Sequence, residues 1–173
     1  EVMGFAGNLQ VSPAAFREKG YAGTFGYAPL NKLEVGASSL LGTSASDVDT
    51  LQPRLRQAYG LWGRWSPVER FGLYLETDLL FDQSGPDDDT ATGLVTDVHF
   101  DWEFVSGVHL MGGGEFCDRR LSEDGAQSRG WGTIQWYLAS HVDLRIDTLM
   151  GPLTCTDGAE GRPMGLAQLH FFL

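Results

Sequence analysis

Four ionisable side chains recur at every second position in one stretch of the chain: Asp97, His99, Asp101 and Glu103. Residues two apart on an extended strand share one face and lie roughly 7 Å apart. Carboxylate oxygens and an imidazole nitrogen at that spacing could bind a metal ion or form a hydrogen-bonded network. Because no recognised metal-binding motif surrounds these residues, we expect the network, with no metal and no other cofactor.

A second grouping, Ser140-His141-Val142-Asp143, brings a serine, a histidine and an aspartate together locally. Nucleophilic catalysis requires a nucleophile within hydrogen-bond reach of a base that another group orients. This grouping falls where a tight turn is expected, so we expect it to end strands and we predict no enzymatic activity. A hydrolase that uses His99 or His141 stays open as an alternative.

The elements that position these residues are strands. In residues 71–81, FGLYLETDLLF, apolar and polar side chains alternate, which is typical of a strand with one apolar and one polar face. Segments of this kind recur near residues 1–10, 20–29, 32–43, 54–65, 71–82, 92–104, 107–117, 129–139, 142–151 and 163–173. Short and long connections alternate between them, which predicts an all-β, antiparallel, up-and-down arrangement of about ten strands in a single domain, residues 1–173.

The alternation assigns a set of ionisable residues to one side of the strands, facing inward. They are Glu34, Arg56, Arg64, Glu76, Asp78, Asp97, His99, Asp101, Glu103, His109, Glu115, Asp143, Arg145, Asp147 and His170. Facing lipid at mid-depth costs about 2–4 kcal/mol for Arg or Lys, so such residues are tolerated in a membrane strand only where they face a polar interior.

Strand length and aromatic placement favour a membrane. A tilted strand of about ten residues crosses the apolar layer of an outer membrane, roughly 25 Å thick. Aromatic residues are expected in two belts, because their rings are apolar yet tolerate headgroup water. One belt comprises Tyr27, Trp65, Phe71, Trp102, Phe104, Tyr137 and Phe171, and the other Phe81, Phe116 and Trp131. We therefore predict a transmembrane β-barrel.

The last nine residues, GLAQLHFFL, resemble the C-terminal insertion signal of the bacterial outer-membrane β-barrel superfamily, with Leu169, Phe171 and Leu173 at its alternate positions. That signal usually ends in Phe, whereas this chain ends in Leu173. The resemblance covers the whole chain and implies an outer-membrane location, short periplasmic turns, longer extracellular loops, and contact with lipid and with protein partners in an envelope complex.

Within that class we expect a lumen filled mainly by side chains and a structural or envelope-anchoring role, or a narrow, cation-preferring pore. The rival from another class is a soluble ligand-binding β-barrel, in which the alternation would be inverted, with apolar residues inside. The net charge of -11 disfavours nucleic-acid binding.

Two features are left open by the sequence. Cys117 and Cys155 fall in predicted long loops on neighbouring strands, where they form either a disulfide, favoured by an oxidising periplasm, or two separate thiols. The chain begins at Glu1 with no visible signal peptide, so strands that precede Glu1 would raise the strand count.

Overall fold

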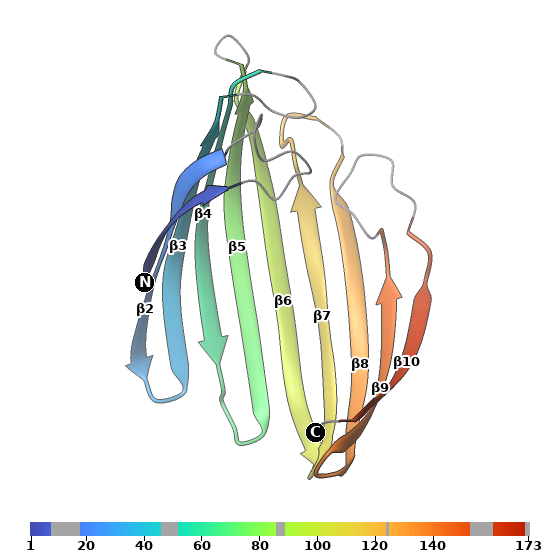
Figure 1. Ribbon diagram of the computed structural model, residues 1–173. Helices are drawn as coiled ribbons and strands as arrows, with labels where there is room; N and C mark the ends of the chain where they lie inside the picture. The colour runs from blue at the N-terminus through green and yellow to red at the C-terminus, as the bar shows by residue number, and fades with distance from the viewer. Residues whose placement is uncertain (8–17, 46–51, 86–88, 124, 153–160, 172–173) are drawn as a thin grey trace.

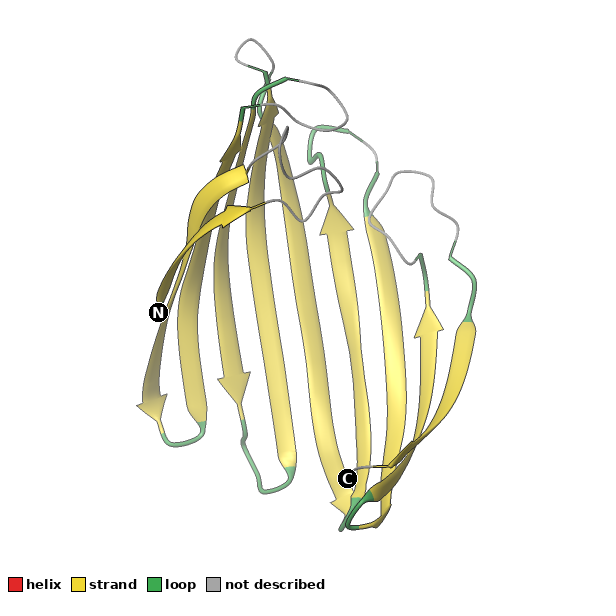
Figure 2. Cartoon of the chain, in the orientation of Figure 1, coloured by secondary structure: helices red, strands yellow, loops and turns green. Residues whose placement is uncertain are grey.

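The computed structural model describes residues 1–7, 18–45, 52–85, 89–123, 125–152 and 161–171, with residues 4–7 described as backbone alone. Its ten strands form one antiparallel sheet in which each strand pairs with the next along the chain (Figures 1 and 2). The strands are β1 (Val2–Gly7), β2 (Glu18–Leu30), β3 (Leu33–Ser44), β4 (Arg54–Trp65), β5 (Phe71–Ser84), β6 (Ala91–Val105), β7 (Val108–Asp118), β8 (Gln127–Ala139), β9 (Val142–Met150) and β10 (Met164–Phe171). The all-β, up-and-down prediction is confirmed.

The short turns all lie at one end of the sheet, at the bottom in Figure 1. The β6–β7 turn requires Gly107, whose φ of 77° is in the left-handed region that glycine adopts without strain. At the end of β2 the register with β3 shifts between Tyr27 and Leu30. Pro29 lies in that interval and has no N–H to donate, so the irregularity occurs where the ladder would lose a bond in any case.

The sheet is open, and this corrects the expectation of a closed barrel. Among the described residues, β1 and β10 are edge strands that pair only with β2 and β9 respectively. β1 is six residues long and pairs only with Glu18 to Gly23, so the chain begins at mid-height of β2. Closure would need pairing between the first and last strands, and neither edge has such a partner here. The C-terminal end of β10 lies beside the β8–β9 turn, with Phe171 in register with Val142.

Glycines allow large side chains to lie flat across one face of the sheet. A Cβ on Gly36 would collide with the Trp62 ring and with the carbonyl oxygen of Phe25. A Cβ on Gly60 would likewise collide with the side chains of Asp78 and Ser38. These glycines therefore let β4 and β5 carry Trp62 and Asp78 on this face without pushing the strands apart.

No hydrophobic side chain is buried among the described residues. The buried polar residues are Asp118, Thr133 and Asp143, of which Asp143 is 0% exposed. A globular protein of this size normally encloses an apolar core. In this sheet the apolar side chains are instead collected on one exposed face.

Candidate functional site on the polar face

The two faces of the sheet differ in charge. The apolar face consists of the strand residues in register with Tyr59, Leu75, Val98 and Ile134. It carries large exposed hydrophobic side chains on β2 to β6 and on β8 to β10, whereas no residue of β7 is exposed. They include Phe25, Tyr27, Val35, Tyr59, Leu61, Trp65, Leu75, Leu79, Val98, Trp102, Phe104, Ile134, Trp136, Ile146, Leu169 and Phe171. Between its two ends this face carries no Asp, Glu, Lys or Arg in the described strands.

The opposite, polar face holds all the ionisable residues that the alternation assigned inward. Strand registers place them in cross-strand rows, such as Glu34, Arg64, Tyr74 and His99, or Glu76, Asp97, Glu115 and Arg129. This face is concave, because residues from β3, β4, β5 and the segment after β7 line one pocket on it. The structure thus brings the expected set to one face; that this face lines a lumen stays a prediction.

A central cluster on the polar face joins β4, β5 and β6. The Tyr74 hydroxyl donates to the Glu76 carboxylate, and the His99 Nδ1 lies 2.7 Å from Oδ2 of Asp97. The Tyr74 and His99 rings are 4.7 Å apart, and the Arg64 guanidinium lies 5.8 Å from the Tyr74 ring centre. Each carboxylate therefore has a hydrogen-bonding neighbour, as expected for a network that fills space.

A second cluster joins β8, β9 and β10. Fully buried Asp143 accepts from Gln135 at 3.2 Å, and its Oδ1 lies 3.1 Å from Nδ1 of His170. Asp147 accepts hydrogen bonds from Thr133 at 2.7 Å, Arg145 at 2.8 Å and Gln168 at 3.0 Å. These bonds tie the last three strands together across the polar face.

At the short-turn end, Asp101 lies 2.8 Å from Nδ1 of His109, on the neighbouring strand. Glu103 accepts a 2.8 Å hydrogen bond from the Gly107 backbone N–H and lies 3.9 Å from Arg70. Glu115 pairs with Arg129 higher on the same face. The acids of this face are therefore distributed over several small pairs.

Asp143 does not join the local serine and histidine. Ser140 and His141 form the turn between β8 and β9, whereas the Asp143 carboxylate points to Gln135 and His170. The expectation that this grouping ends strands is confirmed. In the described part of the chain, no set of three His, Cys, Asp or Glu side chains is placed to hold a metal ion.

Aromatic placement is partly different from the two expected belts. Tyr27, Trp65, Phe71, Trp102, Phe104 and Phe171 lie on the apolar face near the short turns. Trp131 is on the polar face, with its ring centre 6.2 Å from that of His99. Tyr137 is also in register with polar-face Asp143, and its ring is 5.8 Å from His109. These two residues therefore contribute to the polar face instead of a belt.

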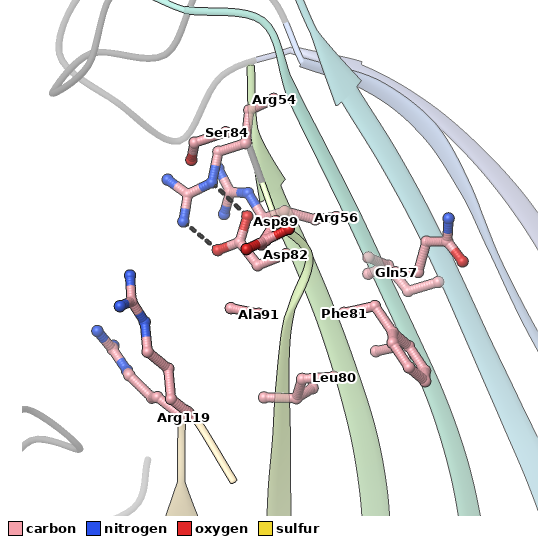
Figure 3. A pocket seen from close by; sticks show the side chains of 13 residues that line it. Arg54, Arg56, Gln57, Leu80, Phe81, Asp82, Ser84, Asp89, Ala91 and Arg119 are labelled. Atoms are coloured by element: carbon pink, nitrogen blue, oxygen red, sulfur yellow. Dashed lines mark hydrogen bonds and ion pairs between the residues drawn. The ribbon is translucent and has the colours of Figure 1, made fainter. Parts of the chain in front are cut away.

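The sequence reasoning missed an arginine-rich pocket at the long-connection end of the polar face. Arg54, Arg56, Arg119 and Arg120 line it, together with Asp82 and Asp89 (Figure 3). Arg54 and Arg56 alternate on β4, which puts them on one face, whereas Arg119 and Arg120 directly follow β7. The alternation of residues could have predicted that Arg54 and Arg56 share one face. That Arg119 and Arg120 line the same pocket follows only from the three-dimensional fold.

Two further sequence expectations concern the chain's cysteines and its C-terminus. Cys117, at the end of β7, is disulfide-bonded. Cys155 lies outside the described residues, so its pairing with Cys117 stays a prediction. Leu169 and Phe171 are 53% and 71% exposed on the apolar face, while Leu173 also lies outside the described residues.

The chain matches no family model, no curated protein and no solved structure. Within the described residues there is no helix of the length and apolar character needed to span a membrane.

Proposed function

We propose that this chain is a bacterial outer-membrane β-barrel whose polar face encloses a largely filled interior, and that its role is structural, as a lipid-embedded anchor for an envelope assembly. The observation that carries the proposal is the exposed apolar face. It extends across the sheet, it is free of charge between its ends, and no described hydrophobic side chain is buried elsewhere. Hydrocarbon would cover such a surface without a second protein layer.

The soluble ligand-binding alternative requires the opposite arrangement. A soluble barrel places apolar side chains inside, around its ligand, and charged ones outside. Here the concave face carries Glu76, Asp97 and Arg64, whereas Leu61 and Leu75 are 70% and 48% exposed on the other face. This arrangement favours the membrane interpretation.

In a membrane the two free edges of the sheet need partners. Lipid offers no hydrogen bonds to backbone groups, so open sheet edges do not occur facing hydrocarbon. The even number of strands makes β1 and β10 antiparallel when brought together. Closure would also cover Met3, Met164 and Leu166, which are apolar residues on the polar face of the two edge strands. We therefore propose that the sheet closes in lipid with β1 facing β10.

A filled interior is favoured over a pore by the pairing on the polar face. Glu76, Asp97, Glu115 and Asp147 each contact a tyrosine, histidine or arginine side chain. Trp62 and Trp131 occupy space above glycines of neighbouring strands. These contacts run along one strand or between two adjacent strands, so paired side chains cover the polar face, and inside a narrow barrel they would leave little room for an ion path.

Membrane fractionation tests the location. The proposal predicts that the chain stays with salt-washed outer membranes, needs detergent for extraction, and migrates differently on gels before and after heating. Recovery in the salt-washed soluble fraction would reject the membrane assignment and leave the soluble barrel as the better account.

Planar-bilayer recording tests the filled interior. We expect no sustained conductance from the wild-type chain. Steady cation-selective currents that lose their selectivity when Asp97, Asp101 and Glu103 are neutralised together would establish the narrow pore instead.

A further inference from the structure

The arginine-rich pocket, defined above by Arg54, Arg56, Arg119 and Arg120, is a cavity of about 760 Å³. That volume is in the range of small-molecule sites. Four arginines and two aspartates line it, and Glu18 and Glu123, outside the lining, pair with Arg56 and Arg120, so the four positive charges are balanced by four negative ones. Anion binding here therefore depends on the placement of the individual guanidinium groups and not on a net positive charge.

The arginines are held in place from two sides of the pocket. Arg54 forms a bidentate ion pair with Asp82, in which its Nε lies 2.8 Å from Oδ1. The Arg56 guanidinium lies 3.5 Å from the Glu18 carboxylate. Across the cavity, Arg120 pairs with Glu123 at 2.9 Å. These contacts orient three guanidinium groups before any ligand arrives, which lowers the entropy cost of binding.

Arg119 differs from the other three arginines. Its side chain is exposed and has no ion pair or hydrogen bond with any residue of the described part of the chain. Figure 3 shows Arg119 on the segment after β7, on the other side of the pocket from the Arg54–Asp82 pair. A cationic group in this position can complete the coordination of an anion that the β4 arginines contact from the other side.

The remaining wall of the pocket is apolar. Leu40, Ala58, Leu80 and Ala91 line it below the arginines. We propose that the pocket binds a phosphomonoester, with the phosphate between Arg119 and the β4 arginines and a small apolar group against Leu40 and Leu80. Guanidinium groups match phosphate oxygens in forked geometry, and a dianion gains from several arginines at once. The phosphate could belong to a soluble ester or to a lipid headgroup.

Isothermal titration calorimetry on the full chain in neutral detergent tests the site. The soluble probe is phenyl phosphate and the lipid probe is dihexanoyl phosphatidic acid. We expect saturable binding of at least one probe, weakened by salt, and a Kd at least about tenfold higher for Arg119→Gln. Arg64→Gln is the matched control: Arg64 is on the same face but pairs with Glu34, 3.8 Å away, at the far end.

Each result has a defined meaning. Binding of phenyl phosphate identifies a soluble ester as ligand, and binding of the lipid probe alone identifies a headgroup. An unchanged Kd for Arg119→Gln overturns the proposal, and so does an equal loss of affinity for Arg64→Gln. The absence of saturable heat with both probes also overturns it and would mean that the chain's own carboxylates neutralise the arginines. Because the Arg119 side chain makes no ion pair or hydrogen bond with the described residues, its replacement should leave the far-ultraviolet circular dichroism spectrum unchanged. A double variant, Arg56→Gln with Arg119→Gln, should abolish measurable binding.

Discussion

Leu75→Arg places a charge at the middle of the apolar face. Leu75 is 48% exposed on β5, where its cross-strand neighbours are Gly63 on β4 and Val98 on β6. None of these neighbours can pair with a guanidinium. If the face contacts hydrocarbon, the substitution should cost about 2–4 kcal/mol of unfolding free energy, as for Arg near a bilayer midplane.

The same substitution in water would have a small effect. An exposed surface position away from special contacts changes stability by about 0.5 kcal/mol or less. Reversible urea unfolding in lipid vesicles, followed by tryptophan fluorescence, separates the two values. Val68→Arg is the control, since Val68 is 59% exposed in the short connection between β4 and β5, beyond the end of the apolar face, and it should cost less than about 1 kcal/mol. A change below about 0.5 kcal/mol for Leu75→Arg would refute the lipid-facing assignment.

Two further substitutions test the packing of the polar face by the same unfolding measurement. Gly36→Ala should destabilise by about 1–3 kcal/mol, because its Cβ would collide with the Trp62 ring. Gly63→Ala on the apolar face should change stability little, because its Cβ would meet no atom closer than 3.8 Å. Equal effects of the two substitutions would mean that Trp62 does not lie over Gly36. Asp143→Leu should lower the free energy of unfolding by about 1–3 kcal/mol, because His170 and Gln135 lose the buried carboxylate that they contact. An unchanged urea midpoint would show that this carboxylate contributes nothing to joining β9 and β10.

The strand arrangement could be predicted from the sequence because it depends on local pattern. The alternation in residues 71–81 places Glu76 and Asp78 on one face whatever the rest of the chain does. Short turns that hold Gly107 or begin near Pro67 mark where strands reverse. The faces and the chain-order topology follow from these local signals alone.

The aromatic belts were predicted less well because residue type was given more weight than alternation. Trp131 alternates with Arg129 and Thr133, so period two already assigns it to the polar face. Its ring is large and apolar, yet it packs beside His99 where Gly113 leaves room. Period two therefore predicts the face on which Trp131 lies. The residues that its ring contacts, on other strands, follow from the strand register, which a linear pattern does not contain.

The open edge and the arginine pocket depend on contacts between distant segments. Whether β1 meets β10 is a question of curvature accumulated over ten strands, which periodicity does not encode. Arg54 and Arg119 are far apart in sequence and face each other only because β4 to β7 form a concave surface. Such sites become visible only with the fold.

The five tryptophans provide the most direct test of the central claim, that one face contacts lipid and the other a polar interior. Trp102 and Trp136 lie on the apolar face, 46% and 49% exposed, whereas Trp62 and Trp131 lie on the polar face. The measurement is fluorescence of single-tryptophan variants, the others replaced by Phe, in vesicles of lipids brominated on their acyl chains. The account predicts strong quenching of Trp102 and Trp136 and little quenching of Trp62 and Trp131. Equal quenching on both faces, or none on either, would contradict it.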